Sequence, residues 1–483
     1  MENLSLRLFF AVLWSSTIPF GYWVRNVGEK KRVRFSSPFD NFSGYVPLFC
    51  LLVPAITLLL PKYKRIMFLH GTLQLLPSLL LLTLLLQVWS PQLRRRFSAR
   101  SCADLWLLPS FLTHAFLFWW NATPDPWLTL RVPVSLFRLL LGLWFGGFCA
   151  VMGWKIVGHF RFRRKILRGS VPVSRQERAL FRQLWSELDP KDRRLGSSVK
   201  IVYAPAISSP LAVGLFSRTV CLALPQREYS EGELRLIFRH ESIHLLRRDN
   251  LTKFSAVFLC AVGWFIPSLW MVMRRAAEDL ELCCDELVTE GMEKAERKEY
   301  AQLLLCSAGT EEGFTTCLSA SAKGLRYRLR RVMRPYGKSA VALMGLLTSL
   351  FVFFFGSIGV ELDAGTVQTA FLDRDQRWHV SALNGWGIER SDDPAVIKAV
   401  EDYLRELKLA RPLWVPQATA KDVIGNVNVY VELTGENGRR AFLCILKNEL
   451  YYFLPGETEP KPQYRIIGDF DVSALRRMAA EAG

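Results

Sequence analysis

His240, Glu241 and His244 form the pattern H-E-x-x-H within the stretch RHESIHLLRRDN at 239–250. On an α-helix, side chains four residues apart leave the same face, so both imidazoles can bind one zinc ion at about 2.0–2.1 Å. Glu241 follows the first histidine, and its carboxylate can take a proton from the attacking water and pass it to the leaving amine. This spacing is typical of a zinc peptidase helix.

A solvated surface helix can also carry these three side chains without binding a metal. Two features of the sequence argue against that interpretation. The motif follows the apolar stretch LRLIF at 234–238 and precedes an apolar segment at 253–272, which predicts that the histidine face is partly buried. The chain has only 6 histidines among 483 residues, so the pattern would seldom arise by chance.

Zinc in a peptidase needs a third protein ligand and an open position. Downstream, the stretch ELCCD places Glu281 and Asp285 four residues apart, on one face of a helix predicted over 278–292. Glu281 is the predicted third ligand, while Asp285 would accept a hydrogen bond from a histidine N–H and fix its tautomer. Glu278 and Asp279 lie just upstream, and spacing alone leaves either of them open as the ligand.

We interpret the other cysteines and histidines considered as ligands as structural residues. Cys283 and Cys284 are adjacent and match no zinc-binding cysteine spacing, so we expect both to be small buried hydrophobic side chains. The remaining histidines are dispersed and are expected to be structural: His70, His114, His159 and His379.

The elements that position the motif can be predicted from local signals. A helix over 230–249 begins with Ser230 and an acidic first turn. Segments rich in β-branched residues and bounded by Pro and Gly predict strands over 200–207 and 218–225, with a further short strand over 208–216. Further helices are expected over 174–188 and 296–309. The apolar segment 253–272 is compatible with either a buried helix or one close to the membrane.

The whole chain is 50% hydrophobic, and long apolar segments set the architecture outside the motif region. Most of them are long enough to cross a hydrocarbon layer of about 30 Å, which predicts a multi-pass α-helical membrane protein. Basic clusters lie beside these segments, so we attribute the net charge of +18 to the positive-inside pattern and not to nucleic-acid binding. The segments are 6–24, 44–60, 67–89, 104–120, 134–157 and 340–360.

These patterns divide the chain into four parts. Residues 1–158 are predicted to form a transmembrane helical bundle, and residues 159–338 a cytoplasmic α+β zinc peptidase domain of the gluzincin type. A final transmembrane helix over 339–361 would lead to a small extracytoplasmic α+β domain over 362–483, which is a candidate sensor.

The order of these features resembles the BlaR/MecR-type antirepressor zinc metallopeptidases, bacterial multi-pass membrane proteins that signal by proteolysis. The resemblance covers residues 160–360 well. The N-terminal bundle is similar only in its general apolar character. Several motifs in one order carry it: SSPLAVGLFSRTVCLALP (208–225), HESIHLLRRDNL (240–251), GWFIPSLW (263–270), EDLELCCDELV (278–288) and LSASAKGLRYRLRRVM (318–333).

The resemblance implies a membrane endopeptidase with one zinc ion per chain. It implies His240 and His244 as zinc ligands with Glu241 as the catalytic base, and it favours Glu281 as the third ligand with Asp285 supporting. Its implied substrate is a cytoplasmic repressor of the winged-helix type, or a site within the protein itself. The expected partners are therefore membrane lipids and this protein substrate, without nucleic acid, and a homodimer is compatible with the sequence.

We also expect roles for one tyrosine and for one short strand. Tyr300 is a candidate for stabilising the oxyanion of the transition state, with a packed helix tyrosine as the alternative. The stretch SPLAVGLF at 209–216 would pair with an extended substrate strand.

The sequence departs from the best-known members of the family in its last part. Their outer domain is a penicillin-binding fold with a nucleophilic serine in S-x-x-K, whereas Ser381, Ser391 and Ser473 have no lysine three residues later. Covalent β-lactam sensing is therefore not expected. Two other functions remain as alternatives: a membrane zinc protease of the prenyl-protein or heat-shock quality-control type, and a non-catalytic membrane receptor with a structural zinc site.

Overall fold

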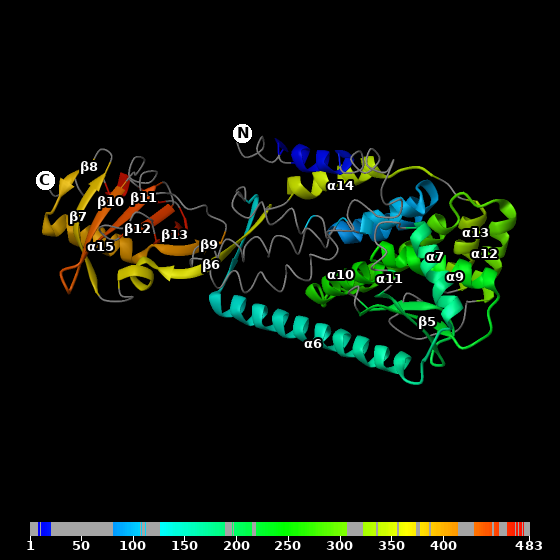
Figure 1. Cartoon of the computed structure of the whole chain (residues 1–483). Coiled ribbons are helices and arrows are strands. Elements are labelled where there is room, and N and C mark those ends of the chain that lie inside the picture. The colour runs from blue at the N-terminus through cyan, green and yellow to red at the C-terminus, as the bar shows by residue number, and fades with distance from the viewer. Residues whose placement is uncertain are drawn as a thin grey trace. The chain divides into compact units, whose positions relative to one another are not determined.

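The computed structural model of the chain divides into two compact units, and each is described by itself (Figure 1). Unit 1 comprises residues 1–53, 75–117 and 144–354, and unit 2 comprises residues 54–74, 118–143 and 355–483. The predicted spans 44–60 and most of 104–120, together with His70 and His114, lie outside the described residues. The structure describes residues 8–9, 11–20, 81–106, 108, 112, 126–188, 196, 198–214, 219–306, 322–334, 337–354, 357–372, 377–385, 388–413, 429–446, 449–453, 461–468, 470–471, 473–475 and 477.

A four-stranded sheet forms the base of the site in unit 1, in the order β2-β3-β5-β4. β3 and β5 are parallel, whereas β2 and β4 pair with them in antiparallel fashion. The three strands predicted from the sequence are present, each shorter than predicted. The bounds are β2 (Val171–Pro172), β3 (Lys200–Ala204), β4 (Leu211–Val213) and β5 (Cys221–Pro225).

The two faces of this sheet are covered by different helices. One face packs on α7 (Arg175–Leu188) and α9 (Glu231–Leu246) through a buried cluster that includes Phe181, Leu222 and Phe238. On the other face, Ile166 near the end of α6 (Val134–Leu167) packs in a second cluster with residues of β3, β4 and β5. The sheet is thus buried on both sides, which holds α9 in a fixed position.

α9 begins and ends with specific local signals. The Ser230 side chain accepts a hydrogen bond from the backbone N–H of Glu233, and the Glu233 carboxylate accepts one from the N–H of Ser230, a reciprocal capping box. At the other end, Arg248 adopts a left-handed conformation with φ of 55°. A non-glycine residue seldom takes this conformation, and here it turns the chain sharply into the next helix.

The apolar segment 253–272 forms parts of two helices and the turn between them. α10 (Asp249–Val262) ends at Gly263, and α11 (Pro267–Val288) starts with Pro267 in its first turn. α12 (Lys294–Cys306) and α13 (Ala322–Met333) pack next to α11. Their shared core contains Ile243, Cys284, Tyr300 and Val332, together with Ala103 from a helix over 99–106.

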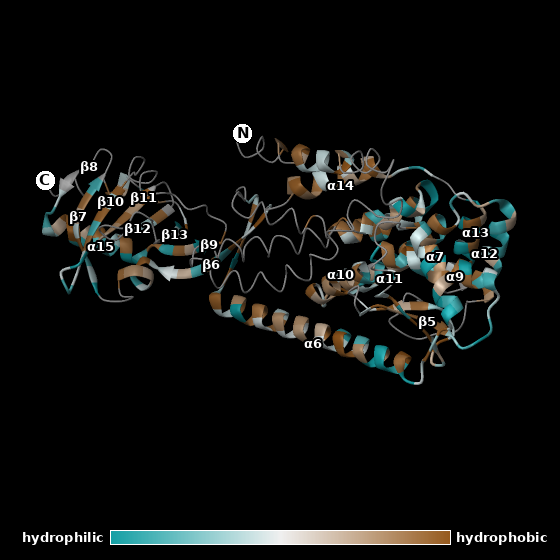
Figure 2. Cartoon of the chain, viewed as in Figure 1, coloured by the Kyte–Doolittle hydropathy of each residue, from teal (hydrophilic) through white to brown (hydrophobic). Residues whose placement is uncertain are grey.

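One helix of the described part of the chain is long and apolar enough to cross a membrane. This is α6, with 34 residues, which is hydrophobic along most of its length and hydrophilic near its C-terminal end (Figure 2). Ala11–Phe20 and α14 (Val341–Phe354) are shorter apolar helices. α14 has 14 residues, a length of about 21 Å, and β6 starts at Ile358, so this helix ends before the predicted limit of 361.

Unit 2 is an α+β fold with a nine-stranded sheet in the order β1-β6-β9-β13-β12-β11-β10-β7-β8. β1 pairs in parallel with β6, so a strand that we assigned to the N-terminal bundle belongs to this sheet. The elements are β1 (Leu128–Val132), β6 (Ile358–Thr366), η2 (Gln368–Leu372), β7 (Trp378–Gly385), β8 (Ile388–Ser391), α15 (Pro394–Glu406), β9 (Lys408–Pro412), β10 (Val429–Gly435), β11 (Arg440–Leu446), β12 (Glu449–Phe453) and β13 (Lys461–Ile466).

Candidate metal centre

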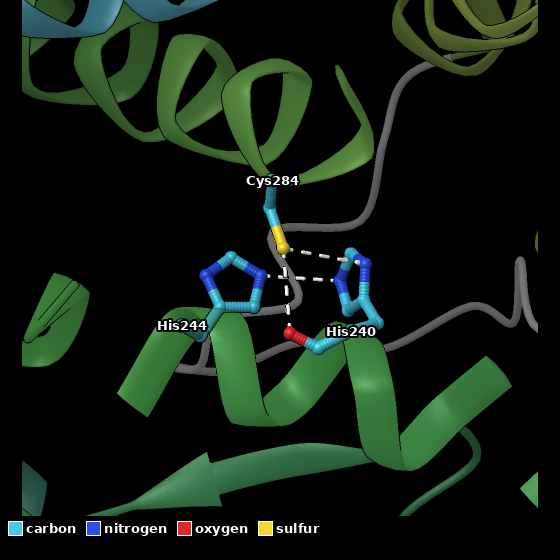
Figure 3. Close-up of side chains that lie close together, drawn as sticks. All are labelled: His240, His244 and Cys284. Atoms are coloured by element: carbon cyan, nitrogen blue, oxygen red, sulfur yellow. Dashed lines mark hydrogen bonds between the residues drawn. The ribbon is translucent and has the colours of Figure 1, made fainter. Parts of the chain in front are cut away.

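The two histidines of α9 face one another one helical turn apart. Their Nε2 atoms are 3.1 Å apart (Figure 3). The side chain of His240 is 14% exposed and that of His244 is 2% exposed. Two N–H groups cannot point at each other at this distance, so at least one Nε2 presents a lone pair to the space between the rings.

Glu281 of α11 lies against both imidazoles. Its Oε2 atom is 3.7 Å from Nε2 of His240 and 3.5 Å from Nε2 of His244. With the 3.1 Å between the two nitrogens, these separations let one point lie about 2 Å from all three atoms, which is the bond length of zinc to nitrogen and oxygen ligands. The three side chains proposed from the sequence therefore meet in a geometry that suits a metal ion.

The acidic neighbours of Glu281 point elsewhere. Glu278 and Asp279 both bind Arg94, with N···O distances of 3.0 and 2.7 Å. Asp279 also accepts a hydrogen bond from the indole N–H of Trp106. Because these two carboxylates are bound to another helix, Glu281 is the acid of this stretch that lies beside the histidine pair.

His244 is oriented by Asp249, the first residue of α10. Nδ1 of His244 is 2.6 Å from Oδ2 of Asp249, and Arg247 binds the other carboxylate oxygen at 3.2 Å. The carboxylate therefore holds the proton on Nδ1 and leaves Nε2 free for a metal. We did not predict Asp249 as a partner of the site, although it lies just after the motif in the stretch HLLRRDN.

His240 is oriented by a longer chain of hydrogen bonds. Its Nδ1 is 2.7 Å from the hydroxyl of Tyr300, and that hydroxyl is 2.8 Å from Oδ1 of Asp285. Asp285 Oδ1 itself is 3.8 Å from Nδ1 of His240, too far for a hydrogen bond. Asp285 thus supports a histidine only through Tyr300, which corrects the direct contact that we expected.

The same contacts revise the role of Tyr300. Its side chain is 1% exposed, and burial together with the charge of Asp285 raises the pKa of its phenol well above the ordinary value. The hydroxyl proton is therefore retained and is donated to Asp285. An oxyanion would need that same proton, so this geometry favours a supporting role behind His240 over the oxyanion role.

Glu281 is held between two cations. Lys253 lies 3.3 Å from its Oε1 atom, and Arg328 lies 3.6 Å from its Oε2 atom. Burial would raise the pKa of Glu281, but His244 and Lys253 outweigh it and bring the pKa well below the ordinary value. The carboxylate stays ionised, as metal ligation requires, and Lys253 keeps Oε1 turned away from the histidines.

Comparison with known proteins shows a likeness between this part of the chain and one family of peptidases. The model of the family described as BlaR1 peptidase M56 matches residues 129–332. The regulatory protein BlaR1 of Bacillus licheniformis is 25% identical over 135 residues, which cover 28% of this chain and 22% of that protein. Residues 129–332 are thus similar to the peptidases of the BlaR1/MecR-type family. The matched part spans about a fifth of the length of this curated relative.

Peptidases of the BlaR1 type are metallopeptidases, and in this chain Cys284 is a further potential donor. Its sulfur is 3.5 Å from Nδ1 of His240, and ligand atoms of His240, His244 and Cys284 all lie within 4.8 Å of one another (Figure 3). Cys284 is buried in the core, as we expected, and its sulfur also lies beside the histidine pair. We favour Glu281 as the third ligand because its Oε2 faces both Nε2 atoms, whereas Cys284 contacts the nitrogen that faces Tyr300.

Glu241 of this BlaR1-type site has the environment of a general base. The residue is 3% exposed, and within the described residues its Oε2 atom has no hydrogen-bond partner. Burial raises the pKa of its carboxyl, against the lowering effect of the two histidines. A buried carboxylate oxygen without a partner is costly, which fits an atom that pairs with water or substrate during catalysis.

The strand expected to bind substrate is covered in this structure. β4 is an edge strand of the BlaR1-type domain, yet its residues are buried. The Asn250 side chain donates hydrogen bonds to the backbone carbonyls of Ala212 and Gly214, both at 3.1 Å. Pairing of a substrate strand with β4 stays a prediction, and it requires that Asn250 release these carbonyls.

Proposed function

We propose that the chain is a membrane zinc endopeptidase of the BlaR1 type that relays a signal by cleaving a protein. The observation that carries this proposal is the convergence of Nε2 of His240, Nε2 of His244 and Oε2 of Glu281 around one point, with Glu241 buried beside them. Bound zinc would polarise the peptide carbonyl and make water a stronger acid.

The residues of the chain would divide the remaining work. Glu241 takes the proton of the attacking water and then gives it to the leaving amine, and its raised pKa brings it closer to the neutral range in which a base is most effective. Asp249 and the Tyr300–Asp285 pair hold the two imidazoles in the tautomer that leaves Nε2 free.

The proposal also covers how the chain is attached to the membrane and on which side each domain lies. α6 supplies one candidate span, and its exposed apolar side chains include Leu139, Leu140, Leu143 and Phe145. We propose that the peptidase domain faces the cytoplasm and that unit 2, with its nine-stranded sheet, receives the signal outside. The substrate would be a winged-helix repressor or a site in the chain itself.

The test uses the full chain in lipid nanodiscs. We expect about one zinc ion per chain by elemental analysis, and cleavage of the winged-helix repressor whose gene lies nearest, or of the chain itself. Glu241→Gln should keep the zinc and lose the cleavage, with Glu278→Gln as the control. Wild-type protein that holds no zinc would reject the proposal.

A receptor with a structural zinc site is the second candidate. The proximity of Cys284 to both histidines favours it, because a fourth protein ligand would close the position that catalysis needs. In that case Glu241→Gln would leave the signalling output unchanged. The same variant therefore separates the two functions.

A further inference from the structure

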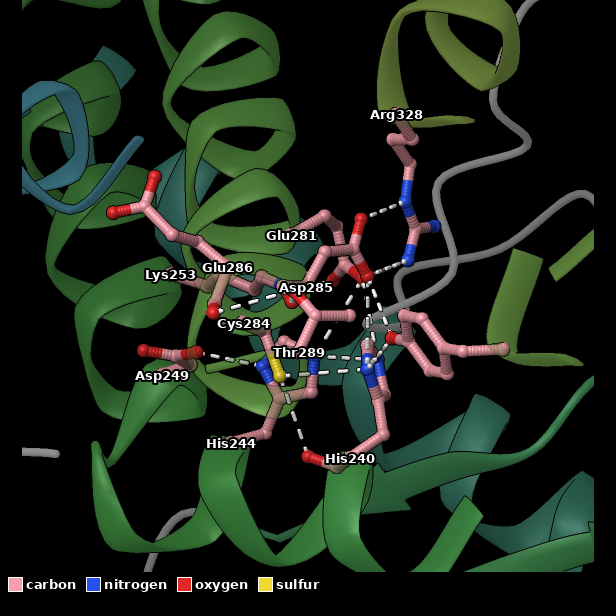
Figure 4. Close-up of polar contacts among 11 residues, drawn as sticks. His240, His244, Asp249, Lys253, Glu281, Cys284, Asp285, Glu286, Thr289 and Arg328 are labelled. Atoms are coloured by element: carbon pink, nitrogen blue, oxygen red, sulfur yellow. Dashed lines mark hydrogen bonds and ion pairs between the residues drawn. The ribbon is translucent and has the colours of Figure 1, made fainter. Parts of the chain in front are cut away.

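Arg328 binds the network behind the metal site from a helix far along the chain. It lies on α13, and its Nε and Nη2 atoms donate to the two carboxylate oxygens of Asp285 at 2.7 and 2.8 Å (Figure 4). Asp285 is 1% exposed and Arg328 is 18% exposed, so this two-point ion pair is largely shielded from water. Such paired contacts fix orientation as well as charge.

The protons in this network can be assigned from its donors and acceptors. The guanidinium of Arg328 can only donate, so both oxygens of Asp285 act as acceptors. The Tyr300 hydroxyl has one proton and gives it to Asp285, which leaves the phenol oxygen to accept from His240. His240 must therefore carry a proton on Nδ1, and its Nε2 is the nitrogen available to a metal.

We propose that Arg328 is a positioning residue that sets the tautomer and orientation of His240 through Asp285 and Tyr300. This inference rests on the proposed metal site. If Arg328 is removed, the Asp285 carboxylate loses the two donors that hold it beside the Tyr300 hydroxyl. The tyrosine proton can then point at Nδ1 of His240, which places the imidazole proton on Nε2, where it opposes metal binding.

α13 is held in the place that this role requires. The Tyr327 hydroxyl donates to the backbone carbonyl of Arg94 at 2.8 Å, and Arg331 donates to that of Phe97 at 3.2 Å. Arg297 of α12 donates to the carbonyl of Val332. These contacts on both sides of Arg328 anchor the helix, so the guanidinium is presented to Asp285 in a defined position.

A purely structural role would make different predictions. Arg328 could simply tie α13 to α11, or it could act directly on Glu281, which lies 3.6 Å away. Neither role involves Tyr300. A variant that removes the tyrosine hydroxyl therefore separates these roles from the relay.

The experiment measures zinc affinity by chelator competition on the full chain in nanodiscs. Residues that orient a metal ligand are worth about 10–100-fold in affinity, and we expect Arg328→Gln to lose this amount. In a Tyr300→Phe background, Arg328→Gln should cost no further affinity, because the relay is already broken. Arg330→Gln, at an exposed position of the same helix, is the matched control and should bind zinc like the wild type.

Arg328→Lys keeps a positive charge without the two-point geometry and should fall between the wild type and Arg328→Gln. The electronic spectrum of the cobalt-substituted protein gives a second readout, which should change in Arg328→Gln and stay unchanged in Arg330→Gln. Wild-type zinc affinity in Arg328→Gln would overturn the inference, as would an equal loss in the presence and absence of the Tyr300 hydroxyl. Both outcomes leave the proposed peptidase intact, whereas wild-type protein without zinc would reject that proposal.

Discussion

Asp249 lies 2.6 Å from Nδ1 of His244, although a left-handed residue and the start of a new helix separate the two elements. The contact is fully buried, with 1% exposure for Asp249 and 2% for His244. It means that the second histidine of the motif is oriented by α10, the next element of the chain, whereas we had predicted only Asp285 of α11 as the partner of a histidine.

Asp249→Asn should weaken zinc binding by about 10–100-fold, because the imidazole loses the carboxylate that holds its proton on Nδ1. The substitution also leaves the buried side chain of Arg247 without this ionised partner, so the free energy of unfolding should fall. Chelator competition and thermal unfolding measure the two effects. Unchanged zinc affinity would show that Asp249 does not orient His244.

Glu281→Gln and Cys284→Ser should differ in their effect on the metal. Removing a direct ligand should cost more than the roughly 10–100-fold typical of supporting residues, so Glu281→Gln should lose more affinity than Asp249→Asn. Cys284→Ser should change affinity little. A sulfur-to-cobalt charge-transfer band in the cobalt-substituted wild type, absent from Cys284→Ser, would instead identify the cysteine as a ligand.

Zinc affinity should rise with pH. Burial lowers the pKa of His240, but Cys284 and Glu281 outweigh it and raise the pKa to about 10, and the pKa of His244 is also raised well above its ordinary value. Without metal, the histidine pair therefore keeps a proton between its two Nε2 atoms through the neutral range, and zinc must displace this proton. The expected gain is up to about tenfold per pH unit for each proton released.

This pH dependence can be measured by chelator competition between pH 6 and pH 8. Titration calorimetry in buffers of different ionisation enthalpy would count the released protons. The sign follows from the raised pKa values, since protonation of the histidine pair stabilises the metal-free site and is lost only as the pH approaches 10. Affinity that does not change with pH would contradict the predicted protonation.

Ser230→Ala should lower the free energy of unfolding by about 1 kcal/mol, because it removes the side-chain acceptor of the capping box that starts α9. Ser230→Asp keeps an acceptor at the same place and should have little effect. Denaturant unfolding of the full chain, compared at equal lipid content, measures the difference. If both variants unfold like the wild type, the box contributes nothing to the stability of the motif helix.

Much of the metal site follows from local geometry. His240 and His244 meet because residues four apart on a helix share a face, and the Ser230 capping box confirms where that helix begins. Three of the four strands of the peptidase sheet, β3, β4 and β5, were predictable from local signals as well, namely β-branched stretches and flanking breakers, whereas β2 was not predicted. Glu281 was one of three nearby acids, and the spacing alone could not choose among them.

The sequence by itself determined the helix, its pair of histidines and the adjacent base, because these depend on neighbours within a few residues. The tertiary structure decided what surrounds them. It directed Glu278 and Asp279 to Arg94, inserted Tyr300 between His240 and Asp285, and added β1 to the sheet of unit 2. Contacts of this kind join segments tens to hundreds of residues apart, so they depend on how the elements pack and not on any local pattern.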